Sequence, residues 1–323
     1  MKMLQFLLSW FVCYIIKNTK IKVSRLVNAI NSKIISKSYW LDNFPSLHIE
    51  NSSFLTTHHD FDINDELGEE LRKIMHYEGY FQTDPPNWNL RIIDMSSAVS
   101  KMAEMNLPIP LVFLFDEFWI IFKKLHNIAE ALLGKGYLRL PDFWGWHVDP
   151  QKKQSGWLPH RDKGYKSLNA DGTPKSITFW IPLSASTPLN GCMYIVPANK
   201  DKTYGTPEDS KFNFDLPSIR ALPAAAGSIL CWNQAVLHWG SQCSEREFQP
   251  RISVAFEFQA GDVAPYNQPV MDPRSIPTFD SRLKLIAKQI IQYQHMYPLS
   301  EELRQLAVDI VGGNDLLVGN IAD

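Results

Sequence analysis

The chain has few cysteines and no surplus of charge of either sign. Four of its 323 residues are cysteines, and because they form no CxxC pair they predict neither a zinc knuckle nor a disulfide framework. We interpret the cysteines as reduced, which is typical of an intracellular, cytoplasmic protein. The 32 basic and 34 acidic residues give a net charge of −2, which gives no reason to expect a nucleic-acid partner.

Long apolar runs are also lacking. The mostly apolar stretch of residues 3–16 is shorter than the roughly 20 residues that a membrane-spanning helix needs. We expect no membrane span, and a helix over 3–16 that packs on the protein or makes peripheral contact with a membrane surface. A secretory signal and a membrane anchor are the alternatives, although Lys17-Asn18-Thr19-Lys20 follows in place of a small-residue cleavage site.

The composition is that of a globular protein, with 45% apolar and 20% charged residues. Helices are predicted where apolar residues recur every three or four positions, in residues 64–77, 111–132, 279–297 and 300–310. Asn64 and Asp65 provide an N-terminal cap for the first helix, and Gly79 ends it. Residues 24–56 show no pattern that predicts an element.

From Leu138 onward short apolar or alternating runs are separated by Pro, Gly, Asn and Asp, which is typical of strands joined by turns. The expected strands are residues 138–148, 158–162, 176–183, 192–196, 219–222, 228–232, 236–239 and 251–259. Eight such strands fit a mainly β fold with a jelly-roll (double-stranded β-helix, cupin-like) core and flanking helices. We expect an N-terminal extension (1–63), a jelly-roll domain with its own N-terminal helices (64–262) and a C-terminal helical extension (263–323).

Three His-x-Asp triplets occur, and His160-Arg161-Asp162 is the best placed of them. In an extended strand, residues two apart point to the same side, so one short segment can supply two metal ligands. Pro159 can begin a strand, and the polar loop 163–175 that follows suits the mouth of a site. His147/Asp149 is the rival pair, whereas His58/Asp60 lies ahead of the β region and is set aside.

A third ligand is expected from His238, in the apolar run Ala235 to Gly240. A single histidine in such a run is ordinarily a core residue. With His160 and Asp162, however, it would complete a set of two histidines and one carboxylate. That set is the facial triad of non-haem Fe(II) oxygenases, which leaves metal positions open for cosubstrate and O2.

The strand 251–259 predicts a pocket for a carboxylate. Arg251 and Ser253 alternate with large apolar residues, and arginine holds a carboxylate through two parallel hydrogen bonds. By the same alternation Thr178 and Trp180 share a face, which we expect to line the pocket. Arg246 is the alternative anchor if residues 245–249 do not form a loop.

These segments together resemble the phytanoyl-CoA dioxygenase family of Fe(II)/2-oxoglutarate oxygenases. The resemblance extends over roughly residues 64–261 and consists of motifs in a specific order. They are Tyr77-Glu78-Gly79-Tyr80, Pro159-His160-Arg161-Asp162, Phe179-Trp180-Ile181-Pro182-Leu183, the stretch from Leu189 to Lys200, Ala226-Gly227-Ser228-Ile229-Leu230, and Pro250-Arg251.

The resemblance implies that His160, Asp162 and His238 bind Fe(II). It also implies that Arg251 holds the far carboxylate of 2-oxoglutarate, with Ser253 and Trp180 as weaker helpers. Enzymes of this family use O2 to oxidise a C–H bond and release succinate and CO2. Halogenating relatives have a small residue at the position of Asp162, so the carboxylate here implies hydroxylation or desaturation.

The sequence departs from the family pattern at three points. Asn199-Lys200 stands where a Ser-His pair is usual, the interval from His238 to Arg251 is long, and the near carboxylate of 2-oxoglutarate has no clear partner. His147 and Gln154 are candidates for that last role.

The substrate is expected to be a small-molecule or acyl metabolite. An anionic substrate is one option, because basic residues surround the predicted metal ligands in sequence: Lys152, Lys153, Arg161, Lys163, Lys166 and Lys175. Solvated loop residues are the simpler interpretation of these side chains. Two other functions stay open: a jelly-roll protein that binds a metal or a small carboxylate ligand without oxidation, and an isomerase or epimerase on a cupin-like barrel.

Overall fold

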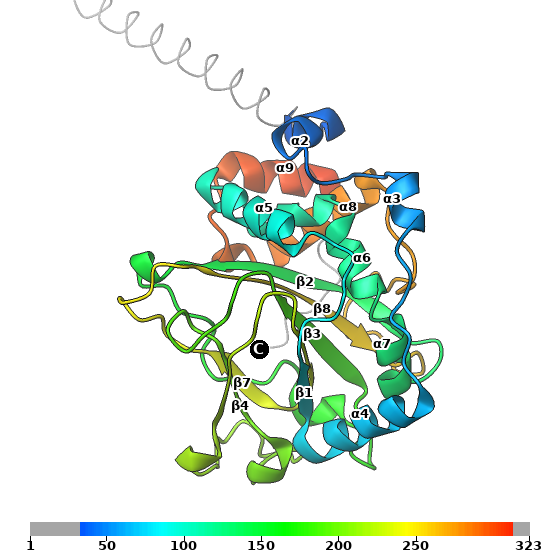
Figure 1. Ribbon diagram of the computed structural model, residues 1–323, viewed down its shortest axis with the longest axis vertical. Coiled ribbons are helices and arrows are strands. Elements are labelled where there is room, and N and C mark those ends of the chain that lie inside the picture. Colours follow the sequence, from blue (N-terminus) through cyan, green and yellow to red (C-terminus); the bar gives the residue numbers. More distant parts are fainter. Residues whose placement is uncertain (1–32, 313–323) are drawn as a thin grey trace, which may run out of the picture.

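A computed structural model describes residues 33–312, in which helices surround two antiparallel β-sheets (Figure 1). The apolar stretch 3–16 lies outside the described residues. Within the described part, no helix is long and apolar enough to cross a membrane.

The larger sheet has five strands in the order β1-β6-β3-β8-β2, and the smaller has three in the order β5-β4-β7. The strands are β1 (Tyr80–Thr83), β2 (Leu138–Val148), β3 (Ser176–Pro182), β4 (Met193–Val196), β5 (Arg220–Leu222), β6 (Ile229–Asn233), β7 (Leu237–Gly240) and β8 (Arg251–Gln259). β8 is central to the larger sheet, since it pairs with β2 along one edge and with β3 along the other.

Most of the strands follow the sequence expectation, and β2 and β8 have the expected bounds. The expected strand at 158–162 is wrong: this segment pairs through one isolated bridge, between His160 and His238. The two backbones approach closely here: a Cβ added to Gly156 would lie 2.4 Å from the Cα of Gly240. Pro159 has no N–H to donate to a β-ladder. β1 was not expected; it extends the sheet by pairing with β6.

The long helix expected over 111–132 is also wrong, because the chain forms three shorter pieces there. They are η1 (Ile109–Leu114), α6 (Glu117–Lys123) and α7 (His126–Leu133). Phe115 is extended, with φ −93° and ψ 146°, and so ends η1. Residues 109–122 are all buried, so their apolar spacing did not mark one continuous helical face.

The remaining helices are partly those expected. α4 (Asp65–Glu78) has Asn64 as its cap and Gly79 at φ +81° as its end. α8 (Phe279–Gln292) lies within the predicted stretch 279–297, and α9 (Glu301–Val311) overlaps the stretch 300–310 and ends one residue beyond it. α5 (Ile92–Glu104) was not predicted, and α2 (Lys37–Asn43) and α3 (Ser52–Thr56) lie in the unassigned stretch. α5 and α8 contact β2, and in Figure 1 α5, α8 and α9 lie on the far side of the larger sheet from β4 and β7.

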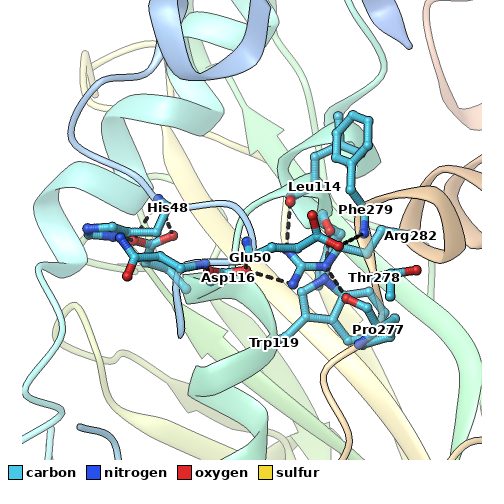
Figure 2. Close-up of polar contacts among 12 residues, drawn as sticks. His48, Glu50, Leu114, Asp116, Trp119, Pro277, Thr278, Phe279 and Arg282 are labelled. Atoms are coloured by element: carbon cyan, nitrogen blue, oxygen red, sulfur yellow. Dashed lines mark hydrogen bonds and ion pairs between the residues drawn. The ribbon is translucent and has the colours of Figure 1, made fainter. Parts of the chain in front are cut away.

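A buried ion pair joins segments that are far apart in sequence (Figure 2). Arg282 of α8 donates to Asp116, just before α6, with an N–O distance of 2.6 Å, and both side chains are fully buried. The backbone N–H groups of Glu50 and Asn51 donate to the same carboxylate. The N-terminal and C-terminal segments are therefore tied to the helices that cover the larger sheet.

Candidate metal and cosubstrate site

The structure brings His160, Asp162 and His238 together between the two sheets. One ligand atom from each residue lies within 4.8 Å of the others, and within the part of the chain described no other group of three such side chains does so. The Nε2 atoms of both histidines are 3.5 Å from Asp162 Oδ1. The backbone bridge between His160 and His238 brings the imidazoles side by side, with ring centroids 4.5 Å apart.

Hydrogen bonds around these three side chains orient their free atoms toward one point. Nδ1 of His160 contacts the carbonyl of Leu158 at 2.7 Å, and Nδ1 of His238 contacts that of Val236 at 3.1 Å. A carbonyl can only accept, so Nδ1 carries the proton in each contact and Nε2 has a free lone pair. This is the pattern by which backbone carbonyls orient metal-binding histidines.

The carboxylate of Asp162 is held through one oxygen. Thr178 Oγ1 donates to Oδ2 at 2.9 Å, and Trp232 Nε1 donates to the same oxygen at 3.0 Å. Oδ1, the oxygen nearest to both imidazoles, accepts neither of these bonds. One oxygen is therefore fixed by the protein while the other is directed at the point between the histidines.

The electrostatics of His238 and Asp162 favour the protonation states that bind a metal. Burial lowers the pKa of His160, but its hydrogen bond with Asp162 and the charge of that carboxylate outweigh it and raise the pKa. Burial lowers the pKa of His238 to about 4, so its imidazole is neutral at pH 7. Burial raises the pKa of Asp162, but the neighbouring His238 and His160 outweigh it and hold that pKa well below its usual range. Neutral imidazole and ionised carboxylate are the states in which these side chains coordinate metal ions.

Arg251 lies in the same cavity and has no carboxylate partner among the described residues. It is 2% exposed. Within residues 33–312, its only polar side-chain contact is a weak one from an Nη atom to Met193 Sδ at 3.6 Å, and its Nε has none. Burial lowers its pKa to about 10, so the guanidinium is still charged at pH 7. A buried, unpaired cation is costly, and it fits a site that receives an anion.

The cavity has a volume of about 280 Å³ and an opening to solvent, and its lining is largely aromatic. Trp180 lines it, with the Arg251 guanidinium 5.8 Å from its ring centre. Thr178 lines it too, but its hydroxyl holds Asp162. Ser253 is fully buried, its Oγ has no hydrogen-bond partner in the described residues, and it does not line the cavity.

The alternative residues lie elsewhere. His147 sits on β2 between the cavity-lining Trp146 and the buried Val148, and it does not line the cavity. Its companion Asp149 caps a short 3-10 helix and accepts from the N–H of Gln151. Gln154 accepts from the N–H of Asp149 and is likewise absent from the lining. Arg246 is exposed in a turn.

Sequence reasoning missed several cavity residues. Lys163 and Glu257 form an ion pair at 2.5 Å inside the cavity, although Lys163 had been counted among solvated loop residues. Trp144 and Trp146 line it from β2, Trp232 from β6 and Tyr293 from the end of α8. The alternation of β2 and β8 could have identified Trp144, Trp146 and Glu257, whereas Tyr293 depends on how the C-terminal segment packs.

Several solved structures resemble this fold. One is the epimerase SnoN in complex with Fe3+, alpha ketoglutarate and nogalamycin RO, at 15% identity and a TM-score of 0.47, covering 67% of this chain and 96% of SnoN. HygX from Streptomyces hygroscopicus, with nickel and 2-oxoglutarate bound, has 14% identity and a TM-score of 0.46, covering 65% of this chain and 98% of HygX. The non-heme monooxygenase ThoJ has 14% identity and a TM-score of 0.46, covering 74% of this chain and 99% of ThoJ.

Sequence comparison gives one further finding. No curated protein matches the chain, but residues 112–247 match the family model described as Phytanoyl-CoA dioxygenase (PhyH). The match spans less than half of the chain; it includes His160, Asp162 and His238 and stops short of Arg251.

Proposed function

We propose that this protein, a member of the phytanoyl-CoA dioxygenase family over residues 112–247, is an Fe(II)- and 2-oxoglutarate-dependent dioxygenase. It would hydroxylate or desaturate a small-molecule or acyl metabolite and release succinate and CO2. The proposal rests on one combination of features. Two histidines and a carboxylate face one point, in a cavity that also holds a buried arginine without a carboxylate partner in the described residues.

We also infer that the two sheets are the halves of a jelly roll, and that residues 64–262 form the oxygenase domain with an N-terminal extension (1–63) and a C-terminal helical extension (263–323). The antiparallel pairing of all eight strands supports the first inference. The contacts of Asp116 with Arg282 and with the backbone N–H groups of Glu50 and Asn51 support the second inference, because they join both proposed extensions to the core.

Each residue has a role that follows from its contacts. His160 and His238 would bind iron through Nε2, and Asp162 through Oδ1, while Thr178 and Trp232 keep Oδ2 occupied. Three protein ligands on one side of the ion leave the other side for cosubstrate and oxygen. Iron with 2-oxoglutarate and O2 supplies the oxidation of a C–H bond when bound.

Arg251 would hold the far carboxylate of 2-oxoglutarate, because an anion would satisfy its guanidinium. Trp180 lies beside that guanidinium, and Ser253 offers an unpaired hydroxyl one pleat further along β8. The guanidinium is almost fully buried, and a low local dielectric strengthens its interaction with an anion.

The test compares two histidines. Purified protein is expected to convert 2-oxoglutarate to succinate only when Fe(II) is present, and His160→Ala should lower that rate by at least about 1000-fold. His147→Ala is the matched control and should keep it, because His147 does not line the cavity. Unchanged turnover in His160→Ala, or loss in His147→Ala alone, would contradict the ligand assignment.

A binding protein without oxidation is the alternative, and a second measurement separates it. Anaerobic addition of Fe(II) and 2-oxoglutarate should give a weak visible absorption band in the wild type and a much weaker one in Arg251→Ala. If the absorption band forms but no substrate in a broad screen leads to succinate, the result would favour the binding protein.

A further inference from the structure

The cavity has a second polar end, opposite Arg251. Arg251 and Glu257 lie on the same face of β8, six residues and so about 20 Å apart. Ser253 and Ala255, both small, lie between them. Trp180 of β3 and Trp144 of β2 pair with Ala255 from opposite sides, and both indoles line the cavity between its two polar ends.

Glu257 and Lys163 form this second end. Glu257 is 4% exposed and lines the cavity together with Lys163. Only Oε2 of Glu257 has a hydrogen-bond partner in the described residues, and that partner is Lys163 Nζ, which makes this one hydrogen bond. Lys163 Nζ has two further donors. A spare donor and a spare acceptor therefore lie side by side in one ion pair.

The structure leaves little free positive charge for an anionic substrate. Arg161 lines the cavity but is bonded to Asp201 at 2.5 Å and to backbone carbonyls. The remaining basic residues that had suggested an anion do not line the cavity: Lys152, Lys153, Lys166 and Lys175. Once Arg251 has a carboxylate partner, the lining offers paired charges, so a charged substrate would lose its hydration without gaining a counter-ion.

An aromatic wall runs between the two polar ends, with Trp144 opposite Ala255 and Trp146 opposite Ser253. The rings of Trp144 and Trp146 are nearly parallel, with an interplanar angle of 14°. Tyr293 packs against Trp144 at a ring separation of 5.7 Å, and its hydroxyl donates to Asp142. Aromatic side chains in a pocket can pack against a ring-shaped ligand over a large area, while a few polar side chains fix the orientation of the ligand.

We propose that the substrate is an uncharged, ring-shaped molecule with hydroxyl groups, packed against Trp144 and Trp146 and hydrogen-bonded to Glu257 and Lys163. Hydroxyls both donate and accept, so neighbouring hydroxyls match the spare acceptor of the carboxylate and the spare donors of the ammonium group. This inference rests on the proposed function and names the class of molecule that its site takes.

Calorimetry on the anaerobic Fe(II)/2-oxoglutarate complex tests the proposal with four related probes. Methyl glucoside is an uncharged hydroxylated ring, methyl glucuronide adds a carboxylate, methyl glucosaminide adds an ammonium group, and cyclohexanol lacks all but one hydroxyl. Methyl glucoside is expected to bind at least about 10-fold more tightly than each of the others. Tighter binding of a charged probe or of cyclohexanol, or no binding of methyl glucoside, would overturn the proposal.

Two variants that unbalance the ion pair make the test specific to this end of the cavity. Lys163→Met leaves a carboxylate and should shift preference toward methyl glucosaminide, whereas Glu257→Gln leaves an ammonium group and should shift it toward methyl glucuronide, each by about 10-fold. Lys166→Met, at an exposed lysine, should change nothing. Unchanged preferences in both variants would also overturn the proposal.

The outcomes separate this proposal from the proposed function. Retained 2-oxoglutarate binding in Lys163→Met and Glu257→Gln shows that each variant is folded. If the wild type consumes 2-oxoglutarate but prefers a charged probe, only the substrate class is wrong. If it binds neither Fe(II) nor 2-oxoglutarate, the oxygenase assignment itself is wrong.

Discussion

Two arginines are almost equally buried in this protein but differ in what surrounds their charges. Arg282 is fully buried in the helical layer, where it donates to Asp116, to the carbonyl of Leu114 and to that of Pro277 (Figure 2). Arg251 is 2% exposed in the cavity between the sheets and has no carboxylate partner in the described residues. The protein itself neutralises the first charge, and the second is free for a ligand.

The comparison shows that burial alone does not identify a functional residue. Arg139 is a third buried arginine, and its Nη2 donates to three backbone carbonyls while its guanidinium lies over Trp119 and Phe256. It does not line the cavity that holds Arg251, and it is fully buried. Arg251 differs because it combines an unmet charge with a cavity, and that combination indicates binding.

The largest expected effect is on stability, from Arg282→Met. Removing the guanidinium leaves the Asp116 carboxylate buried without a counter-ion, which costs about 3–5 kcal/mol. Denaturant titration should show this loss in the free energy of unfolding, with the KM for 2-oxoglutarate unchanged in the folded fraction. Asp116→Asn/Arg282→Met removes both charges and should recover part of the loss. A raised KM would mean that Arg282 also serves the site.

Arg251→Met should have the opposite profile. Loss of a buried hydrogen-bonded charge pair with 2-oxoglutarate is expected to raise the Kd for 2-oxoglutarate about 100-fold, which corresponds to about 2.7 kcal/mol. The free energy of unfolding should not fall, because the variant removes an unpaired buried charge. Calorimetry and denaturant titration measure the two quantities. Arg246→Met, at an exposed arginine, is the control and should leave both unchanged. If it weakened 2-oxoglutarate binding instead of Arg251→Met, the anchor assignment would be wrong.

The two arginines also show where sequence reasoning succeeds. Alternation along β8 is a local property, so Arg251, Ser253 and the apolar face of the strand could be predicted from the chain itself. Recurrent motifs likewise pointed to His160, Asp162 and His238. Asp116 and Arg282 are 166 residues apart, and nothing local in either segment indicates that they meet.

The errors have the same origin. The stretch 111–132 has helical spacing, but it is buried on all sides as far as residue 122, and the partners of Asp116 come from distant segments. Residues 158–162 have strand-like alternation, yet they pair through the single bridge between His160 and His238, and Pro159 has no N–H to donate to a β-ladder. Lys163 looked like a loop residue because its partner Glu257 is 94 residues away.

A smaller effect is expected from Thr178→Val, which tests how the carboxylate is held. The substitution keeps the shape and removes the hydroxyl that donates to Asp162 Oδ2, and loss of such a supporting bond lowers metal affinity by about 10-fold. A competition titration with a chelator should show weaker Fe(II) binding, with the 2-oxoglutarate Kd changed only through the metal. Thr56→Val, at an exposed threonine, should leave Fe(II) affinity unchanged. Unchanged affinity in Thr178→Val would mean that Trp232 alone suffices.

The smallest effect concerns His58, a buried side chain outside the cavity whose two ring nitrogens have no partner in the described residues. Burial and then the charge of Lys124 lower its pKa. The unfolded chain therefore binds a proton near pH 6.5 before the folded protein does, so stability should fall as pH decreases below that value, by at most about 1.4 kcal/mol per pH unit. His58→Leu should flatten this part of the stability profile, whereas His59→Leu, at an exposed histidine, should not. If the slope persisted in His58→Leu, another titratable group would cause it, and the buried imidazole of His58 would not control this part of the stability profile.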